Sequence, residues 1–401
     1  MYSIEETLRV LDAQPLAEPA IEQVDLVDAV GRVAAVDLHA RWSMPAFDTC
    51  AMDGYAIALD PARPLGPYRL TGMIAAGEAS ELTLSPGEAA QVLTGAPVPA
   101  GANGVAQQEK TRSDDETVLL NAPLCYGSHI RLQGSELAAG SLLLAQGERV
   151  RSLQIGLLAS QGVTRLDVYR RPRVGVLSSG DELLPPGAPP QAGHIHDANR
   201  PQLLALLRQS GAQAVDLGQV EDDPTALRDR LVQAAGQCDI VIGSGGASVG
   251  ERDHLRATVA TLGAISHWQV AIKPGKPFAF GHIRGKPFFG LPGNPVAAAL
   301  TFLLLARRFV ARACGERVQP APWQQLALAE SVDNPTMRRL FIRGALVEQD
   351  GERLAQPLEL QGSAALASLA SADLLIEVPE RSTLAAGTMV RCHFLNSWAI
   401  V

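Results

Sequence analysis

The chain has 401 residues, of which 47% are hydrophobic and 19% charged, and its formal net charge is −8. This length exceeds one ordinary hydrophobic core, so we expect about two to four domains in a well-packed soluble protein. Aromatic residues make up only 4% of the chain, which argues against stacking platforms for nucleic acid. An acidic chain that binds an anion must do so locally, through loops and a few lysines.

Membrane and disulfide-rich classes are also not expected. No apolar stretch approaches the ~20 residues of a membrane span, and the first residues, "MYSIEETLRVL", lack a charged-then-apolar export signal. The cysteines are scattered and never form a C-x-x-C pair, which argues against a disulfide framework or a zinc knuckle; they are Cys50, Cys125, Cys238, Cys314 and Cys392. We therefore expect a cytoplasmic protein.

Residues 1–40 predict a helical, elongated N-terminal domain, to which the helix-like residues 141–171 return. Between them, residues 41–140 contain short apolar runs broken by turns, which is typical of an inserted β module. Residues 172–316 alternate strands and helices, and residues 317–401 indicate a small β-barrel or sandwich. The predicted fold class is multidomain α/β plus β.

The alternating segment is the most regular part of the chain. Strands are expected within 173–182, 212–223, 238–246 and 286–295, and helices within 199–211, 224–236, 253–263 and 296–310. This spacing is typical of a doubly wound, mostly parallel sheet. Ligands of such sheets bind beyond the carboxyl ends of the strands, and here each of those ends carries an unusual loop.

The third strand ends in the glycine-rich loop "GSGGASVGERD", residues 243–253. A Rossmann motif fails because Ser248 stands where glycine is needed, and a P-loop fails because Glu251 and Arg252 replace its lysine and hydroxyl residue. One alternative is a tight turn whose glycines serve packing alone. The neighbouring "SSG" favours an oxyanion cradle of backbone N–H groups, formed by Ser178, Ser179, Gly180, Gly245, Gly246, Ser248 and Gly250.

Carboxylates cluster at the same strand ends and suit Mg²⁺, which takes oxygen ligands; they are Asp181, Glu182, Asp222, Asp223 and Asp253. Helix capping is the alternative: it is favoured for Asp223 and is balanced against metal binding for Glu182 and Asp253. Lys273 and Lys276 lie in a proline-rich loop and are expected to meet anionic oxygens.

The remaining candidate residues give weaker signals of a catalytic or metal site. No G-x-S-x-G elbow is present, and His194 with His196 fits two ordinary loop histidines better than a metal pair. In the β module, "PAFDTCAMDGYAI" contains Asp53 and "LTGAPVPAGA" contains an exposed Thr94. Both stretches also fit simple β-turns.

Taken together, these stretches resemble the MoeA/gephyrin family, the molybdopterin molybdenumtransferases. "AMDGYA", "LTGAPVP", "SSGDEL", "SGGASVGERD", "IKPGKPFAF" and "GLPGNP" occur in the family's order over residues 45–295. The resemblance implies a four-domain homodimer whose active cleft lies between the α/β domain of one subunit and the β module of the other. It also implies that molybdate is inserted into adenylylated molybdopterin in the presence of Mg²⁺, with release of AMP.

The resemblance assigns roles to individual residues. Catalytic positions are Asp53, Thr94, Glu182, Asp222 and Asp253, with Asp53 and Thr94 acting from the partner subunit. Besides the cradle, substrate contacts fall on Asp181, Lys273, Lys276, Pro292, Asn294 and Pro295, and metal contacts on Glu182, Asp253 and Glu136. Candidate partners are the molybdopterin adenylyltransferase and recipient molybdoenzymes; no nucleic acid and no membrane are expected.

Three positions depart from the family pattern. Ser135 and Glu136 stand in the place of an acidic pair, Cys50 replaces a serine, and Gln269 replaces a lysine. These changes keep a non-catalytic carrier of molybdopterin as an alternative. A molybdopterin adenylyltransferase is a weaker alternative, because that activity needs only the α/β part.

Overall fold

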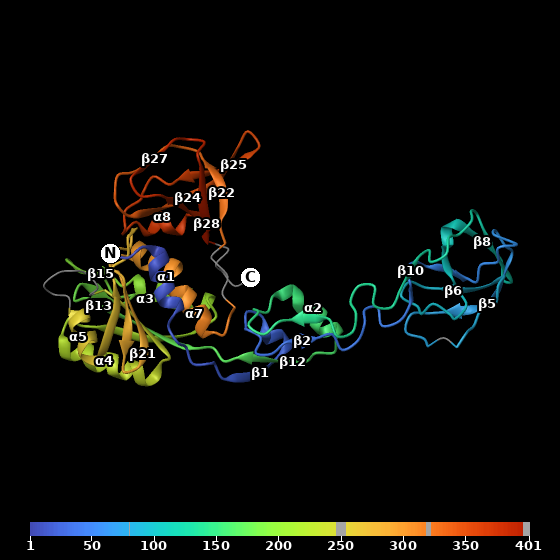
Figure 1. Ribbon diagram of the computed structural model, residues 1–401, viewed down its shortest axis with the longest axis horizontal. Coiled ribbons are helices and arrows are strands. Elements are labelled where there is room, and N and C mark those ends of the chain that lie inside the picture. The colour runs from blue at the N-terminus through green and yellow to red at the C-terminus, as the bar shows by residue number, and fades with distance from the viewer. Residues whose placement is uncertain (80, 246–253, 318–321, 396–401) are drawn as a thin grey trace. The chain divides into compact units, whose positions relative to one another are not determined.

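The computed structural model describes residues 1–79, 81–245, 254–317 and 322–395 (Figure 1). The chain divides into two compact units. The main unit comprises residues 1–36, 146–156 and 164–401, and the β unit comprises residues 37–145 and 157–163. Among the described helices, none has the length and apolar character needed to cross a membrane.

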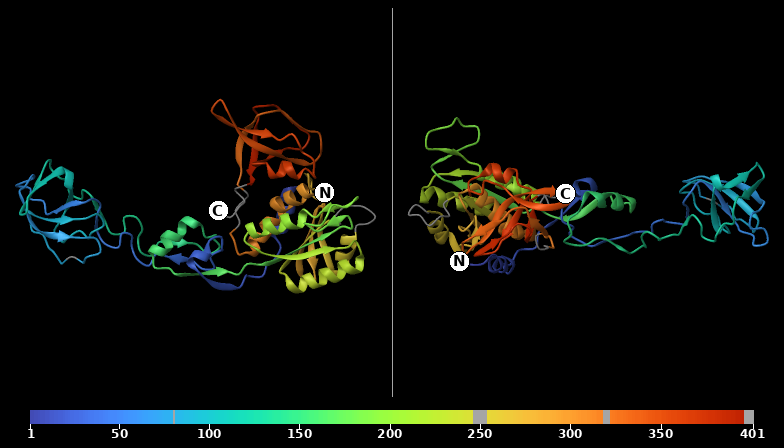
Figure 2. Two further views of the ribbon diagram at one scale, coloured as in Figure 1. Left: turned by 180° about the vertical axis from the view of Figure 1, so that it is seen from behind. Right: turned by 90° about the horizontal axis from the view of Figure 1, so that it is seen from above.

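The β unit consists of short strands, as predicted. They are β2 (Leu38–His39), β3 (Thr49–Cys50), β4 (Gly54–Ile57), β5 (Tyr68–Ile74), β6 (Glu88–Val92), β7 (Gly104–Gln107), β8 (Thr111–Ser113), β9 (Thr117–Leu120), β10 (Ile130–Arg131) and β11 (Leu142–Leu144). The largest sheet has the order β7-β4-β6-β5-β9-β8. Side chains alternate along β4, so Ala56 packs into one apolar cluster, and Tyr55 and Ile57 pack into another. Figure 2 shows this sheet from two further sides.

The prediction of a helical segment over residues 1–40 is wrong beyond the first helix. Only α1 (Ile4–Asp12) forms, and the 3₁₀ turn Leu26–Ala29 follows β1 (Ile21–Asp25). Pro15 and Pro19 interrupt the helical pattern, and β1 pairs antiparallel with β12 (Arg165–Tyr169) instead. Within the helix-like residues 141–171, only α2 (Ser152–Ser160) is helical.

The main unit contains a mixed six-stranded sheet of order β16-β13-β17-β21-β20-β18. Its strands are β13 (Arg173–Ser179), β16 (Gln213–Val220), β17 (Ile240–Ser244), β18 (Gly263–Trp268), β20 (Ala279–Ile283) and β21 (Lys286–Leu291). The first four in the sheet order are parallel, which confirms a mostly parallel sheet. The antiparallel strands β20 and β18 were not predicted. The turn between β20 and β21 is Arg284–Gly285 and not the Asn-Gly pair that signals a hairpin, and among the described strands β18 pairs only with β20.

Helices cover both faces of this sheet, as a doubly wound fold requires (Figure 1). They are α3 (Asn199–Gln209), α4 (Pro224–Gln237), α5 (His254–Leu262), α6 (Pro295–Thr301), the π-helix Phe302–Ala306 and α7 (Arg307–Ala313). Val176 and Ile242 pack against α3, α6 and α7, whereas Leu177 and Val241 pack against α4 and α5. The core therefore has two layers, separated by the period-2 alternation of the strands.

The C-terminal segment forms a closed five-stranded barrel rather than a sandwich. Its strands are β22 (Gln324–Leu328), β24 (Arg339–Gln349), β25 (Glu352–Pro357), β26 (Leu374–Val378) and β28 (Met389–Phe394), and the pairing of β24 with β26 closes it. The smaller elements are β23 (Val332–Asn334), α8 (Leu366–Ala370) and β27 (Ser382–Leu384). The short strand β19 (Ile272–Lys273) pairs with β24 and so joins the barrel to the loop that follows β18.

Candidate functional site

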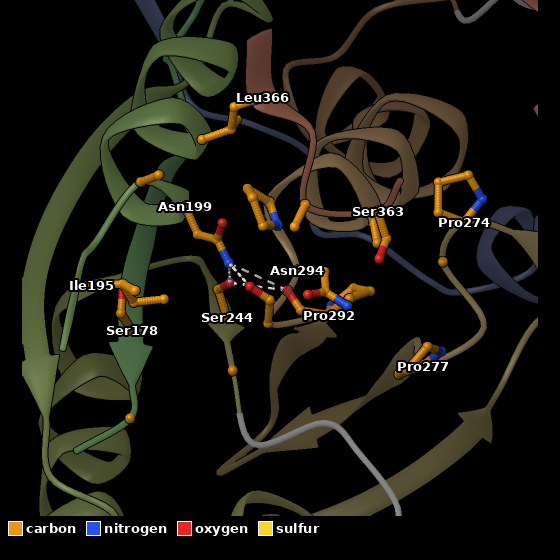
Figure 3. Close-up of a pocket in the computed structure, with 18 of the residues that line it drawn as sticks. Ser178, Ile195, Asn199, Ser244, Pro274, Pro277, Pro292, Asn294, Ser363 and Leu366 are labelled. Atoms are coloured by element: carbon orange, nitrogen blue, oxygen red, sulfur yellow. Dashed lines mark hydrogen bonds between the residues drawn. The ribbon is translucent and has the colours of Figure 1, made fainter. Parts of the chain in front are cut away.

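A cavity of about 1000 Å³ lies in the main unit beyond the carboxyl ends of β13, β17 and β21 (Figure 3). Its lining includes eleven of the predicted site residues: Ser178, Ser179, Gly180, Glu182, Asp222, Gly245, Lys273, Lys276, Pro292, Asn294 and Pro295. Parallel strands end at the same edge of a sheet, so loops that are far apart in the sequence converge there.

The remaining predicted residues are not among these lining residues, for different reasons. Gly246, Ser248, Gly250 and Asp253 are outside the described residues. Asp53, Thr94 and Glu136 belong to the β unit. Asp181 binds a residue of the cavity wall: its Oδ1 accepts a hydrogen bond of 3.0 Å from the backbone N–H of Asp222.

Gly245, the last described residue of the glycine loop, must be glycine because it packs against the end of β13. It has a φ of +94°, and a Cβ there would lie 2.2 Å from the carbonyl oxygen of Ser179. Its N–H points to the carbonyl oxygen of Leu291 at 3.4 Å. At this position the packing explanation is sufficient, and the oxyanion cradle stays a prediction for the rest of the loop.

The carboxylates separate into two roles. Asp223 is the N-cap of α4 and accepts a hydrogen bond of 2.8 Å from Ala226 N–H, so its predicted capping role is confirmed. Glu182 is exposed and Asp222 half-buried at the cavity. No group of three His, Cys, Asp or Glu residues that could hold a metal ion occurs in the described part of the chain. These two carboxylates still provide the oxygen atoms that Mg²⁺ prefers.

Positive charge reaches the cavity from two distant segments. Lys273 and Lys276 come from the loop after β18, and Arg338 comes from the segment before β24. The backbone bond from Arg339 N–H to the carbonyl oxygen of Ala271 (2.9 Å) joins these segments, so Arg338 lies close to the lysine loop. The N-terminal ends of α3 and α6 also line the cavity, and helix N-termini favour anions.

A buried polar network under the cavity was missed by the sequence analysis. Asn199 Nδ2 donates to Ser244 Oγ (2.8 Å) and to the carbonyl oxygens of Gly293 (2.7 Å) and Pro292 (3.4 Å), as the dashed lines in Figure 3 show. One amide therefore ties the start of α3 to the ends of β17 and β21. The sequence signal, a polar residue at a helix start, predicts local capping only.

A second missed network lies beside the first. Asp197, 2% exposed, accepts hydrogen bonds from Ser178 Oγ (2.7 Å) and from Arg200 Nε (2.9 Å). Arg200 also donates to both carboxylate oxygens of Asp216. Burial lowers the pKa of Arg200, but the hydrogen bonds that its guanidinium donates to Asp216 and to Asp197 outweigh this effect, so the pKa rises and the guanidinium stays charged.

In the β unit, Asp53 and Thr94 lie together. Antiparallel pairing of β4 with β6 brings the residue before β4 to the residues after β6. The N–H and Oγ1 of Thr94 both donate to Asp53 Oδ1, at 2.6 and 2.7 Å. Both residues are exposed, and the hydroxyl and N–H of Thr94 lower the pKa of Asp53 below its ordinary value.

Comparison with known proteins covers the whole chain. The model of the MoeA N-terminal region (domain I and II) matches residues 2–162, that of a probable molybdopterin binding domain matches residues 175–312, and that of the MoeA C-terminal region (domain IV) matches residues 325–395. A molybdopterin molybdenumtransferase of Haemophilus influenzae is 34% identical over 94% of each chain. Molybdopterin molybdenumtransferase 2 of Mycobacterium tuberculosis is 34% identical over 98% of this chain and 99% of its own.

Solved structures agree with the sequence comparison. The crystal structure of a molybdopterin biosynthesis MoeA protein from Pyrococcus horikoshii covers 98% of this chain and 99% of its own, with a TM-score of 0.81 and 32% identity. Matching sequence models, full-length relatives and a shared fold thus coincide with the convergence of the predicted strand-end loops on one cavity. The chain belongs to the MoeA family.

Proposed function

We propose that this protein is a molybdopterin molybdenumtransferase, which inserts molybdate into adenylylated molybdopterin and releases AMP in molybdenum cofactor biosynthesis. The observation that carries the proposal is that lysines, helix N-termini and carboxylates all line one cavity at the strand ends. A nucleotide joined to a phosphorylated pterin is a polyanion that needs such a combination. The curated relatives over nearly the full length carry this name.

The groups around the cavity suit different parts of that substrate. Lys273, Lys276 and Arg338 would neutralise phosphate oxygens, aided by the N-terminal ends of α3 and α6. Mg²⁺ would be held by Glu182 and Asp222, with Asp253 as a further candidate and substrate phosphates completing its shell. The ion would withdraw charge from the phosphate that leaves with AMP.

Asp53 and Thr94 would serve the molybdate or pterin end from the second subunit of a homodimer. Their exposure in the β unit supports this role, because exposed side chains are accessible to a ligand. Glu136, also exposed in the β unit, would add a metal contact. We further propose four domains, formed by residues 1–40 with 141–171, by 41–140, by 172–316 and by 317–401, in a cytoplasmic protein that passes its product to recipient molybdoenzymes.

A non-catalytic carrier is the second candidate, because Gln269 and Ser135 depart from the family pattern. Gln269 adopts a φ of +63°, donates its N–H to the carbonyl oxygen of Phe278 (2.8 Å), and is not among the described residues that line the cavity. Gln269 therefore contributes nothing to the described cavity wall, so this departure gives no reason to prefer the carrier over the enzyme. The β unit and the barrel argue against an adenylyltransferase, which needs only the α/β part.

A turnover assay separates these candidates. Purified protein receives adenylylated molybdopterin, Mg²⁺ and molybdate, and both AMP and molybdenum cofactor are quantified. We expect both products from the wild type and neither from Asp53→Ala. Asp114→Ala is the matched control, because Asp114 of the same unit also accepts bonds from a threonine N–H and hydroxyl, those of Thr117. Tight substrate binding without either product would replace the enzyme by the carrier.

A further inference from the structure

Arg343 of β24 is completely buried, which is rare for arginine without an acidic partner. Along β24, Ile342 faces the barrel interior, and Phe341 on the opposite face packs into the core that the barrel shares with the α/β sheet. Arg343 lies on the same face as Phe341 and pairs across the strands with Leu375 of that shared core. Among the described residues, no carboxylate forms an ion pair with it.

The guanidinium instead binds one short segment of chain. Arg343 Nη2 donates to the carbonyl oxygens of Leu360 (2.7 Å) and Gly362 (3.1 Å), and Nε donates to Ser368 Oγ (3.0 Å). All three acceptors lie within residues 360–368, the connection between β25 and β26. Arg343 Nη1 has no hydrogen-bond partner among the described residues, so this connection alone binds the guanidinium, and losing any of these bonds would leave a further buried group unsatisfied.

Gln361, which belongs to the same segment, forms hydrogen bonds with the backbone of Arg343 and of Leu358. Its Oε1 accepts a hydrogen bond from Arg343 N–H (3.0 Å), and its Nε2 donates to the carbonyl oxygens of Arg343 (2.8 Å) and Leu358 (2.7 Å). Beyond the end of β25 at Pro357, the backbone N–H of Leu358 still donates to the carbonyl oxygen of Arg343 (2.9 Å), and the Gln361 carboxamide supplies the acceptor for the Arg343 N–H. Residue 343 therefore binds the connection through both its side chain and its backbone.

The segment held in this way forms one wall of the cavity. Gln361, Gly362, Ser363, Ala364 and Leu366 line it, and Figure 3 shows Ser363 and Leu366 among the side chains around it. The carbonyl oxygen of Ser363 also accepts a hydrogen bond of 3.1 Å from Val296 N–H in the first turn of α6. The wall is thus fixed to the helix whose start lies at the cavity.

The structure assigns Arg343 and Gln361 a positioning role: they hold residues 360–366 as a preformed wall against which the substrate binds. This inference deepens the proposed function, on which its AMP-binding and turnover readouts depend, whereas its hydrogen-exchange readout does not. A wall that is ordered before binding spares the substrate the entropy of ordering it. Loosening the wall should therefore weaken binding much more than it changes the chemical step.

The test uses the full chain with Arg343→Lys and, as a second variant, Gln361→Met, which removes the hydrogen bonds of the carboxamide without adding a charge at the cavity. Arg32→Lys is the matched control, because Arg32 is another buried arginine of the main unit and binds Glu22 and the carbonyl oxygen of Tyr169. Both test variants should speed amide hydrogen exchange in residues 360–366 about tenfold and raise the Kd for AMP and the KM about 5- to 10-fold. The kcat should change less than about twofold, and Arg32→Lys should change neither the exchange nor the binding.

Two outcomes would overturn the inference: wild-type exchange in residues 360–366 with only a lower melting temperature, or an unchanged Kd for AMP in both variants. If Arg343→Lys does not fold, Gln361→Met decides alone. If the wild type binds AMP but forms no cofactor, the proposed function fails while the exchange and AMP measurements still decide the positioning role.

Discussion

Asp197 and Asp216 bind the same arginine but differ in exposure, so they allow a sharp prediction about the floor of the cavity. The side chain of Asp197 is 1% exposed and that of Asp216 is 49% exposed. The buried carboxylate accepts bonds from Ser178 Oγ, from Arg200 Nε and from the Arg200 backbone N–H (3.1 Å). Asp216 forms two short bonds to Arg200 Nη1, but water screens them.

The change Asp197→Asn conserves shape but cannot conserve these bonds. In either orientation, the new amide group points its own hydrogens at a donor, which is the Arg200 guanidinium or the Arg200 backbone N–H. We expect a loss of about 3 kcal/mol, as for breaking a buried ion pair that leaves groups unsatisfied. Asp216→Asn removes a more exposed partner and should cost less than about 1 kcal/mol.

Native-state hydrogen exchange at the amides of β13 and α3 is the suitable measurement, because it reports local opening free energies without assuming that the whole chain unfolds in one step. The expected order is Asp197→Asn far above Asp216→Asn. The reasoning would be refuted if the exposed substitution cost as much as the buried one, since burial would then not decide the strength of the network.

Three further predictions concern single residues. Thr94→Ala should raise the pKa of Asp53 toward its ordinary value, because the Thr94 hydroxyl is the largest cause of the lowered pKa; Thr94→Ser should leave that pKa unchanged. An NMR titration that follows the carboxyl carbon of Asp53 measures the pKa. Equal values in the wild type and both variants would contradict this prediction. Burial lowers the pKa of His267, so stability should fall with pH from about 6.5 down to the folded pKa, by at most about 1.4 kcal/mol per pH unit. The variant His267→Gln should lose less on acidification when thermal unfolding is compared at about pH 7.5 and about pH 5.5. Gly275→Ala would place a Cβ 2.7 Å from a buried methyl group at a φ of +122°, and should cost about 2 kcal/mol and raise the KM by displacing the lysine loop. Gly351→Ala, at a φ of +80° in open space, should cost about 1 kcal/mol without affecting the KM, and an equal KM in the two variants would argue against the loop's role.

The α/β part of the fold was predictable because its signals are local. The alternation of apolar strands and capped helices between residues 173 and 313 is visible without tertiary contacts, and Asp223 capped its helix as predicted. The strands β1 and β20 were missed because pairing, rather than propensity, determines them: β1 is stabilised by β12, and β20 by β21 across an atypical turn. Loop convergence at one sheet edge was predictable from topology alone.

The supporting residues of the cavity were not predictable for a different reason. Asp197 and Asn199 gain their roles from partners 19 and 45 residues away, which are Ser178 and Ser244. Arg343 gains its role from backbone carbonyl oxygens and a hydroxyl in the connection between β25 and β26. Sequence periodicity places a side chain on a face but says nothing of which polar atoms meet there.

The buried polar groups lie where the strands of the α/β sheet end, and this placement indicates a binding site. Between the helix layers, the sheet buries apolar side chains such as Val176, Ile242 and Phe289. Toward the ends of β13 and β17, Ser178 and Ser244 occupy buried positions instead. Buried polar networks contribute little net stability compared with well-packed apolar residues, so stability alone does not account for them. They do fix geometry, because each donor has few acceptors within reach. A sheet edge that gives up apolar packing for fixed geometry beside this cavity has the organisation expected of a site that must hold a charged substrate in one orientation.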